Sequence, residues 1–155
     1  MKTYFTKYCC IFVMLITAFS CSDDDNAVAS PNDLSVTDEI LKLINEHRAS
    51  EGLSPLEVNA TAERLAIEHT EYMIAEADIS HDNFQARSNE LNQSENASSA
   101  AENVASFYPN AASVVEGWLN STGHRNNIEG NYTHTGIAAL QDENGNYYYT
   151  QLFYR

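Results

Sequence analysis

The C-terminal pattern constrains the fold more than any other feature of this chain. Residues 136–140 form a short apolar run, and residues 147–154 are rich in aromatic and β-branched side chains, as strands are. Asn144-Gly145 lies between these runs and predicts a tight type I′ turn. The chain is therefore expected to end in an antiparallel hairpin. The tyrosines at 147–149 should alternate between its faces, which leaves at least one of them exposed.

Two helices are predicted before the hairpin. Ser35 and Asp38 have the spacing of a capping box, and apolar residues then recur at helical spacing, so the first helix should span about 36–51. Asn59 can cap a second helix that runs to about Ala77. The buried side of this second helix is expected to contain Ala62, Leu65, Ala66, His69, Tyr72 and Met73.

The middle of the chain is less regular. Residues 78–99 are polar with weak periodicity and predict a long loop, with one or two helical turns at 87–91. Residues 101–105 predict a short buried strand, and Pro109 suits the first turn of a further helix that should stop near Thr122. Helices followed by a hairpin indicate an α+β domain in which helices cover an antiparallel sheet.

The N-terminal segment has the form of a secretory signal. Lys2 and Lys7 precede an apolar stretch that is too short to span a membrane. Ala-Phe-Ser-Cys at 18–21 resembles a bacterial lipobox, so residues 1–20 are predicted to be a lipoprotein signal peptide. Cys21 would then carry the lipid and anchor the protein in the membrane. The alternative is an ordinary signal whose cleavage leaves a free thiol.

An acidic, polar segment follows this cysteine. Residues 21–34 contain too little apolar side chain to form a core and are predicted to be a tether. Ser-Asp-Asp-Asp at 22–25 resembles the signal that exports some Gram-negative lipoproteins to the outer face of the outer membrane. This predicts a surface-exposed, extracellular lipoprotein of the bacterial cell envelope, with a merely solvated linker as the alternative. Residues 35–155 then form one domain, which has no cysteine and cannot use disulfides.

The charge of the chain excludes one class of partner. Eight Lys and Arg stand against 22 Asp and Glu, and removal of Lys2 and Lys7 with the signal would change the formal charge from −14 to −16. Binding of nucleic acid requires a basic face, so no nucleic-acid partner is expected. Anionic lipid headgroups would also repel the domain, so membrane attachment is expected to come from the lipid on Cys21 and not from the protein surface.

Three titratable residues are candidates for a functional site. His81, Glu102 and His124 lie far apart in sequence, each beside apolar or turn residues. This arrangement is expected when loops and element ends bring ionisable side chains into one cleft. Two imidazoles and one carboxylate are also the ligand set of catalytic zinc, so a divalent metal such as zinc is a candidate cofactor, with a metal-free cleft as the alternative.

Other polar residues are expected to have structural roles. Arg48 should tie the first helix to neighbouring carbonyls and carboxylates, since its guanidinium is a fork of donors. His69 is expected to be a packed helix residue, and Trp118 is expected to lie in the core. Arg125 is a candidate to orient Glu102, and a surface charge is the alternative.

Five motifs follow one another along the domain. The first two motifs are residues 44–56 and residues 65–73, and the third is Ala101-Glu102-Asn103. The fourth runs from Trp118 to Ile128, and the fifth consists of residues 134–137 and 149–153. In order and spacing they resemble the CAP superfamily (cysteine-rich secretory proteins, antigen 5 and pathogenesis-related 1), and most closely its bacterial, cysteine-free SCP-like branch. The resemblance implies an α-β-α sandwich with a central antiparallel sheet and a cleft.

The resemblance also implies roles for single residues. Many members place two histidines and two glutamates in the cleft. His81 and His124 match the two histidines, and Glu102 matches the first glutamate. The second glutamate, three positions after the tryptophan of the fourth motif, is Ser121 here.

Two classes of function are weighed. In the first, the domain is a non-catalytic binding module for a small apolar ligand, a divalent metal, or an envelope or host partner that the sequence does not identify. Resemblance to members implicated in sterol and lipid binding supports this class. In the second, it is a hydrolase of the peptidase type, with His81 or His124 as general base, Glu102 orienting that base and Ser121 as nucleophile. No nucleophile-elbow or HExxH pattern accompanies these residues, so binding is favoured over catalysis. A purely structural coat protein is a third possibility.

Overall fold

The computed structural model describes Met1 and residues 35–155, so the predicted signal peptide, the tether and Cys21 lie outside the described residues. The elements, in chain order, are α1 (Val36–Ser50), β1 (Glu57–Val58), α2 (Ala60–Glu76), α3 (Phe84–Glu95), β2 (Ala100–Ser106), α4 (Ala111–Asn120), α5 (Thr122–Ile128), β3 (His134–Gln141) and β4 (Tyr147–Tyr154). No helix within that described part is both long and apolar enough to span a membrane.

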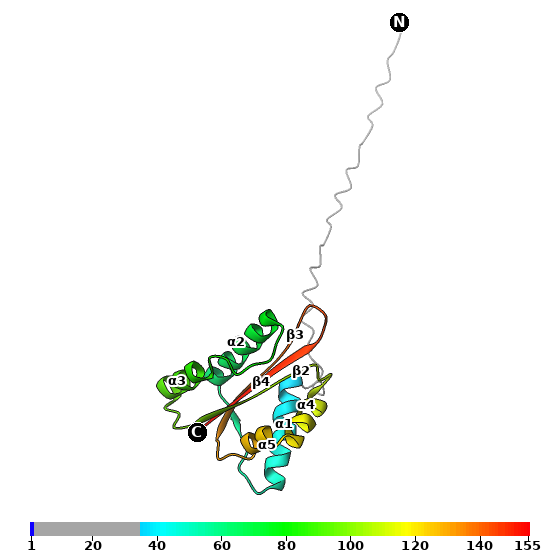
Figure 1. Ribbon diagram of the computed structural model, residues 1–155. Coiled ribbons are helices and arrows are strands. Elements are labelled where there is room, and N and C mark those ends of the chain that lie inside the picture. Colours follow the sequence, from blue (N-terminus) through cyan, green and yellow to red (C-terminus); the bar gives the residue numbers. More distant parts are fainter. Residues whose placement is uncertain (2–34) are drawn as a thin grey trace. The chain divides into compact units, whose positions relative to one another are not determined.

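The strands form one sheet with helices on both faces. The strand order is β1-β3-β4-β2, and all neighbours are antiparallel except the short β1–β3 pair. Helices α1, α4 and α5 cover one face, and α2 and α3 cover the other (Figure 1). This is the α-β-α sandwich expected from the sequence. Strand β2 lies at an edge, so its outer backbone groups face no neighbouring strand of the described domain.

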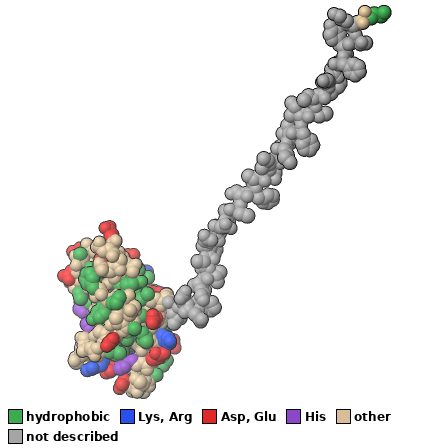
Figure 2. Space-filling view, turned by 90° about the vertical axis from the view of Figure 1, so that its right-hand side faces the viewer, with side chains coloured by type: hydrophobic (Ala, Val, Ile, Leu, Met, Phe, Trp, Pro, Cys, Tyr) green, Lys and Arg blue, Asp and Glu red, His purple; other side chains and the backbone are tan. Residues whose placement is uncertain are grey.

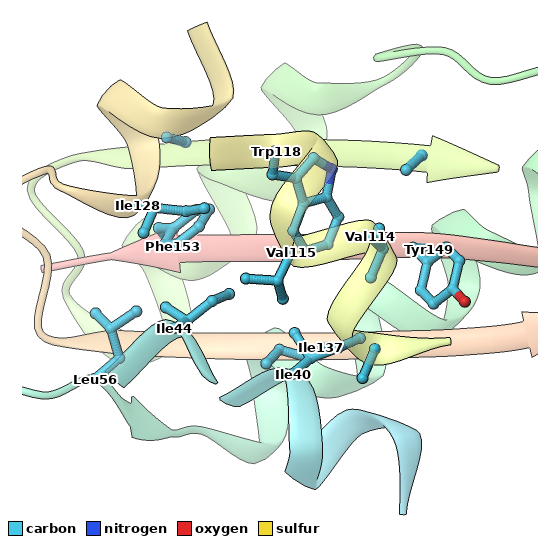
Figure 3. Packing of buried hydrophobic residues seen from close by; sticks show 13 residues of the cluster. Ile40, Ile44, Leu56, Val114, Val115, Trp118, Ile128, Ile137, Tyr149 and Phe153 are labelled. Carbon is cyan, nitrogen blue, oxygen red and sulfur yellow. The ribbon is translucent and has the colours of Figure 1, made fainter. Parts of the chain in front are cut away.

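Alternate residues of the strands contribute to opposite cores. Tyr149 and Phe153 of β4 pack with Trp118 of α4 and Ile44 of α1 (Figure 3), and the Trp118 and Tyr149 rings meet edge to face at 6.5 Å. Tyr148 faces the opposite side. Because helices cover both faces, Tyr148 and Tyr149 are 2% and 0% exposed. Tyr147 is half-buried, so none of the three tyrosines is exposed and the expectation is wrong, although the alternation is correct.

Helix α2 lies directly against β3. A Cβ atom at Gly136 would overlap the backbone of Ala62 and Glu63, so this strand position requires glycine. The acidic side chains other than Glu102 are at least partly exposed among the described residues, and many are spread over the face shown in Figure 2. The predicted starts of α1 and α2 are confirmed. The Ser35 hydroxyl accepts a hydrogen bond from the Asp38 amide, and the Asn59 side chain accepts one from the Ala62 amide.

The long loop predicted for residues 78–99 is wrong. Helix α3 occupies Phe84–Glu95 within it, although only Arg87 and Leu91 of that helix are buried. Two buried positions one turn apart give too short a pattern for a periodicity argument. The helix also begins after Asn83, whose side chain forms no capping bond.

Two further boundaries differ from expectation. Helix α4 is capped by Asn110, whose side chain accepts from the Ser113 amide, and Pro109 lies outside the helix. The chain then turns at Ser121 into α5, which was not predicted.

The predicted type I′ turn of the hairpin is wrong, because Gly145 alone among the turn residues has a positive φ, of 81°. The Asp142 carboxylate instead accepts backbone bonds from Asn144 and Asn146 and closes a wider loop.

Candidate functional site

Glu102 of β2 is a buried carboxylate held by Arg87 of α3. Its side chain is 1% exposed. Arg87 donates from Nε to Oε2 and from Nη2 to Oε1, both at 2.8 Å, and its Nη1 donates to the Asp82 carbonyl. A carboxylate is tolerated at this depth only when its charge is compensated and its oxygens are hydrogen-bonded. Helix α3 supplies this compensation, which explains why an arginine lies on its buried side.

Two histidines flank this carboxylate. His81 Nδ1 lies 2.9 Å from Glu102 Oε1, and the His81 ring is 54% exposed. His69 of α2 is fully buried, and its Nε2 lies 3.8 Å from the same oxygen. The His69 Nε2 atom also lies 2.8 Å from the Ser80 carbonyl, so it carries the proton and donates. Burial lowers the pKa of His69, although its bond to Ser80 opposes the shift, and the ring is therefore neutral at pH 7.

His124 lies on α5, which packs against the outer edge of β2. Its backbone carbonyl accepts from Asn103 Nδ2 at 3.2 Å, and Asn127 of the same helix donates to the Glu102 carbonyl at 3.1 Å. Within residues 35–155 the imidazole of His124 forms no hydrogen bond. Burial lowers the pKa of His124, and the nearby His81 lowers it further. The second imidazole of the site is therefore also neutral at pH 7.

A pocket of about 320 Å³ adjoins His124. We call it the β2-edge pocket, and its walls include apolar Ile79, Val104, Ala105 and Trp118 and polar Tyr108, Ser121 and His124. Ser121 joins α4 to α5, and its hydroxyl forms no capping hydrogen bond. The structure thus brings together His81 and Glu102 as one pair, and Ser121 and His124 as another at the pocket.

These residues do not fit a zinc site. The described residues contain no group of three or more His, Cys, Asp or Glu side chains that could hold a metal ion. Both oxygens of Glu102 accept from Arg87, whose positive charge would also oppose binding of a cation. Among residues 35–155, the metal set predicted from His81, Glu102 and His124 is therefore not preformed.

Two contributors to this site were missed in the sequence. Arg87, and not Arg125, orients Glu102; Arg125 donates instead to the Leu119 carbonyl at 3.2 Å. No local pattern identifies Arg87, because Arg87 and Leu91 are only two buried positions in a polar segment. The other is helix α5, which carries His124. The core position of Trp118 is confirmed, since the residue is 1% exposed and donates from its indole to the Val104 carbonyl.

Buried His69 and half-buried His124 should make folding stability depend on pH. Their pKa values are lowered in the folded state, so the unfolded chain takes up protons first as the pH falls through the ordinary histidine value of 6.5. The free energy of unfolding should therefore decrease from about pH 7.5 to about pH 5. The measurement is urea unfolding at both pH values for wild type, His69→Gln and His124→Gln. Each variant should lose less stability than wild type, and an unchanged pH dependence in both would contradict the assignment.

Two curated proteins of Bacillus subtilis are similar to this chain. The uncharacterized membrane protein YlbC is 34% identical over 119 residues, which cover 74% of this chain and 33% of that protein. The uncharacterized protein YkwD is 28% identical over 122 residues, which cover 76% of this chain and 48% of that protein. The chain thus spans between a third and a half of the length of these relatives.

Solved structures and a family pattern match the same domain. An outer surface protein from Borrelia burgdorferi superposes with a TM-score of 0.69 at 23% identity, over 79% of this chain and 96% of that one, and this likeness shows the fold alone. An extracellular protein containing a SCP domain from Bacillus anthracis gives a TM-score of 0.67 at 28% identity, over 77% of this chain and 40% of that one. The pattern of the cysteine-rich secretory protein family matches residues 41–153. This match covers both flanks of the sheet and the whole site, and the chain belongs to the cysteine-rich secretory protein (CAP) family.

Proposed function

We propose that this protein is a lipid-anchored, extracellular binding module whose β2-edge pocket holds a small, largely apolar ligand. The observation that carries the proposal is the pocket itself, with apolar Ile79, Val104 and Trp118 among its walls and few polar groups. No Lys, Arg, Asp or Glu among the described residues lines it. Mostly apolar pockets with a few fixed polar groups are typical of sites for small uncharged ligands.

The same geometry favours binding over hydrolysis. A serine hydrolase needs a base at the hydroxyl and a carboxylate that orients the base. Here the Glu102 carboxylate is engaged by Arg87 and His81, whereas Ser121 and His124 line a pocket that excludes all three. The described residues therefore show no hydrogen-bonded Ser-His-Glu triad, because His81 contacts Glu102 whereas His124 shares the pocket with Ser121. The hydrolase alternative keeps one supporting observation, which is that Ser121 and His124 share the pocket.

Filling the pocket should abolish binding of an apolar probe. Ser121→Ala should leave the affinity for the probe unchanged, because the Ser121 hydroxyl forms no capping bond. In Ser121→Trp the indole should occupy the pocket and lower this affinity at least about tenfold, which corresponds to about 1.4 kcal/mol. The measurement is fluorescence titration with the neutral probe N-phenyl-1-naphthylamine, with melting temperatures as the folding control. Equal affinity in Ser121→Trp and Ser121→Ala would contradict the proposed pocket.

The same matched pair tests the hydrolase alternative. Loss of a true nucleophile costs several orders of magnitude in rate, whereas loss of an unbonded hydroxyl leaves the fold intact. A library of peptides and esters should show no turnover that depends on Ser121. Hydrolysis that disappears in Ser121→Ala at an unchanged melting temperature would make this protein a serine hydrolase.

The anchoring part of the proposal rests on the sequence and on the relatives. One similar structure is named an extracellular protein, and one relative is named a membrane protein. Cys21→Ala should move the protein from the membrane fraction to the soluble fraction when it is expressed in a Gram-negative host. Cys10→Ala, which changes a cysteine inside the apolar stretch, should leave it in the membrane fraction. Retention of Cys21→Ala in the membrane would identify the apolar stretch itself as the anchor.

A further inference from the structure

The outer edge of β2 presents backbone groups that no strand of the described domain pairs. Hydrogen bonds join Ser99 to Arg155 and Phe107 to Tyr147 at the two ends of the β2–β4 ladder. In an antiparallel ladder, bonded residues alternate with residues whose amides and carbonyls point outward. The register of β2 and β4 is continuous, so the even-numbered residues of β2, from 100 to 106, direct their backbone groups to the free edge.

Helices α4 and α5 satisfy two of the outward carbonyls but not the amides between them. Trp118 donates to the Val104 carbonyl, and Asn127 donates to the Glu102 carbonyl. Within residues 35–155, the amides of Val104 and Ser106 have no acceptor. An unpaired amide at the edge of a sheet is a ready partner for an added strand. Both residues line the β2-edge pocket, so the pocket wall carries two unpaired donors.

We propose that the ligand of this pocket is a short extended peptide segment that pairs with the outer edge of β2 at Val104 and Ser106. The proposal rests on the proposed function and names its ligand class. The two donors belong to residues two apart on one strand, about 7 Å along it, which is the repeat of same-side carbonyls in an extended peptide. A sterol or fatty acid has a single polar end and would leave one donor unpaired. The donor spacing therefore selects a peptide over a lipid.

The surroundings limit the length and charge of this peptide. Asn127 occupies the Glu102 carbonyl and Trp118 occupies the Val104 carbonyl, so a peptide of two or three residues can pair only with the Val104 amide and with Ser106. The pocket has no charged wall among the described residues, so an apolar, uncharged side chain fits beside Trp118. At the open end, Phe107 has a positive φ of 65° and is 63% exposed. A bulky residue rarely adopts this conformation, and here the ring packs against Tyr148 at 5.6 Å while its exposed side can contact the next residue of the peptide.

The direct test is amide hydrogen exchange measured by NMR with the capped peptide N-acetyl-Val-Leu-Val-amide as the probe. Saturating peptide should slow exchange at Val104 and Ser106 at least tenfold. Ala105 lies between them and already pairs with Tyr149 of β4, so its exchange is the internal control and should not change. Binding without protection at both edge amides would overturn the proposal, as would failure of the peptide to bind at millimolar concentration.

A matched pair of variants gives a second readout. Ser106→Pro removes the outward amide, a change that edge strands tolerate, whereas Ser106→Ala keeps it. Ser106→Pro should weaken peptide binding at least tenfold, and Ser106→Ala should not. If Ser106→Pro does not fold, the wild-type exchange pattern decides.

Two further probes separate this proposal from the proposed function. Binding of N-phenyl-1-naphthylamine, measured in parallel, reports on the pocket alone. If that probe binds and the peptide does not, the pocket function stands and the peptide proposal fails. The other outcome is that oleic acid or cholesterol binds, that the peptide does not, and that the two amides stay unprotected. This outcome would identify a lipid site and would also overturn the peptide proposal.

Discussion

Replacement of Arg87 by leucine is expected to destabilise the domain by about 3–5 kcal/mol, because it leaves a buried carboxylate without its compensating charge. Arg87 is the side chain that gives Glu102 two hydrogen bonds at 2.8 Å, and Glu102 is 1% exposed. His81 contacts one oxygen only, and buried His69 is neutral, so neither can replace a bidentate guanidinium. The measurement is urea unfolding monitored by circular dichroism at pH 7.

A double-mutant cycle and an exposed control test the reason for this loss. Arg87→Leu combined with Glu102→Leu removes both charges and should be more stable than Arg87→Leu alone. Arg64→Leu is the matched control, because Arg64 pairs with Glu68 and Glu90 at the surface, where an ion pair contributes roughly 0–1 kcal/mol. If Arg87→Leu costs no more than Arg64→Leu, the Glu102 charge is not compensated by Arg87.

Features with a local signature were predictable from the sequence. The caps at Ser35 and Asn59 are side-chain bonds to amides three residues later, and both were found where the residue types indicated. The two strands of the hairpin show in their composition, although the turn between them does not follow Asn144-Gly145 alone. Asp142 determines that loop by accepting from amides up to four residues away, which a dipeptide signal does not contain.

Features that depend on tertiary contacts were not predictable. Arg87 has no local reason to be buried, because its partner Glu102 lies on a strand that follows α3 in the chain. Helix α5 was missed because Ser121 ends one helix and begins the next within a single residue. The β2-edge pocket depends on both helices and on the end of β2. Sequence reasoning could therefore nominate His81, Glu102, Ser121 and His124, but it could not show that His81 contacts Glu102 while Ser121 and His124 line the pocket.

Replacement of Arg48 by methionine should cost at least about 3 kcal/mol, since each buried carbonyl left unpaired costs roughly 1–3 kcal/mol. Arg48 is 2% exposed, and its role as a tie to neighbouring carbonyls is confirmed. Its guanidinium donates to four carbonyls, those of Ser54, Ile128, Gly130 and Tyr132. One side chain thus fixes the turn after α1 and the turn between α5 and β3.

Two further variants on α1 separate these hydrogen bonds from the charge of the residue. Arg48→Lys keeps the charge, but a single ammonium cannot reach carbonyls on both turns, so it should recover only part of the loss. Lys42→Met removes an exposed cation that pairs with Glu46 on the same helix, and it should cost less than about 0.5 kcal/mol. Urea unfolding of the three variants measures all of these values. Full recovery by Arg48→Lys would show that charge is sufficient, whereas a loss below about 1 kcal/mol in Arg48→Met would show that water can replace the guanidinium at these carbonyls.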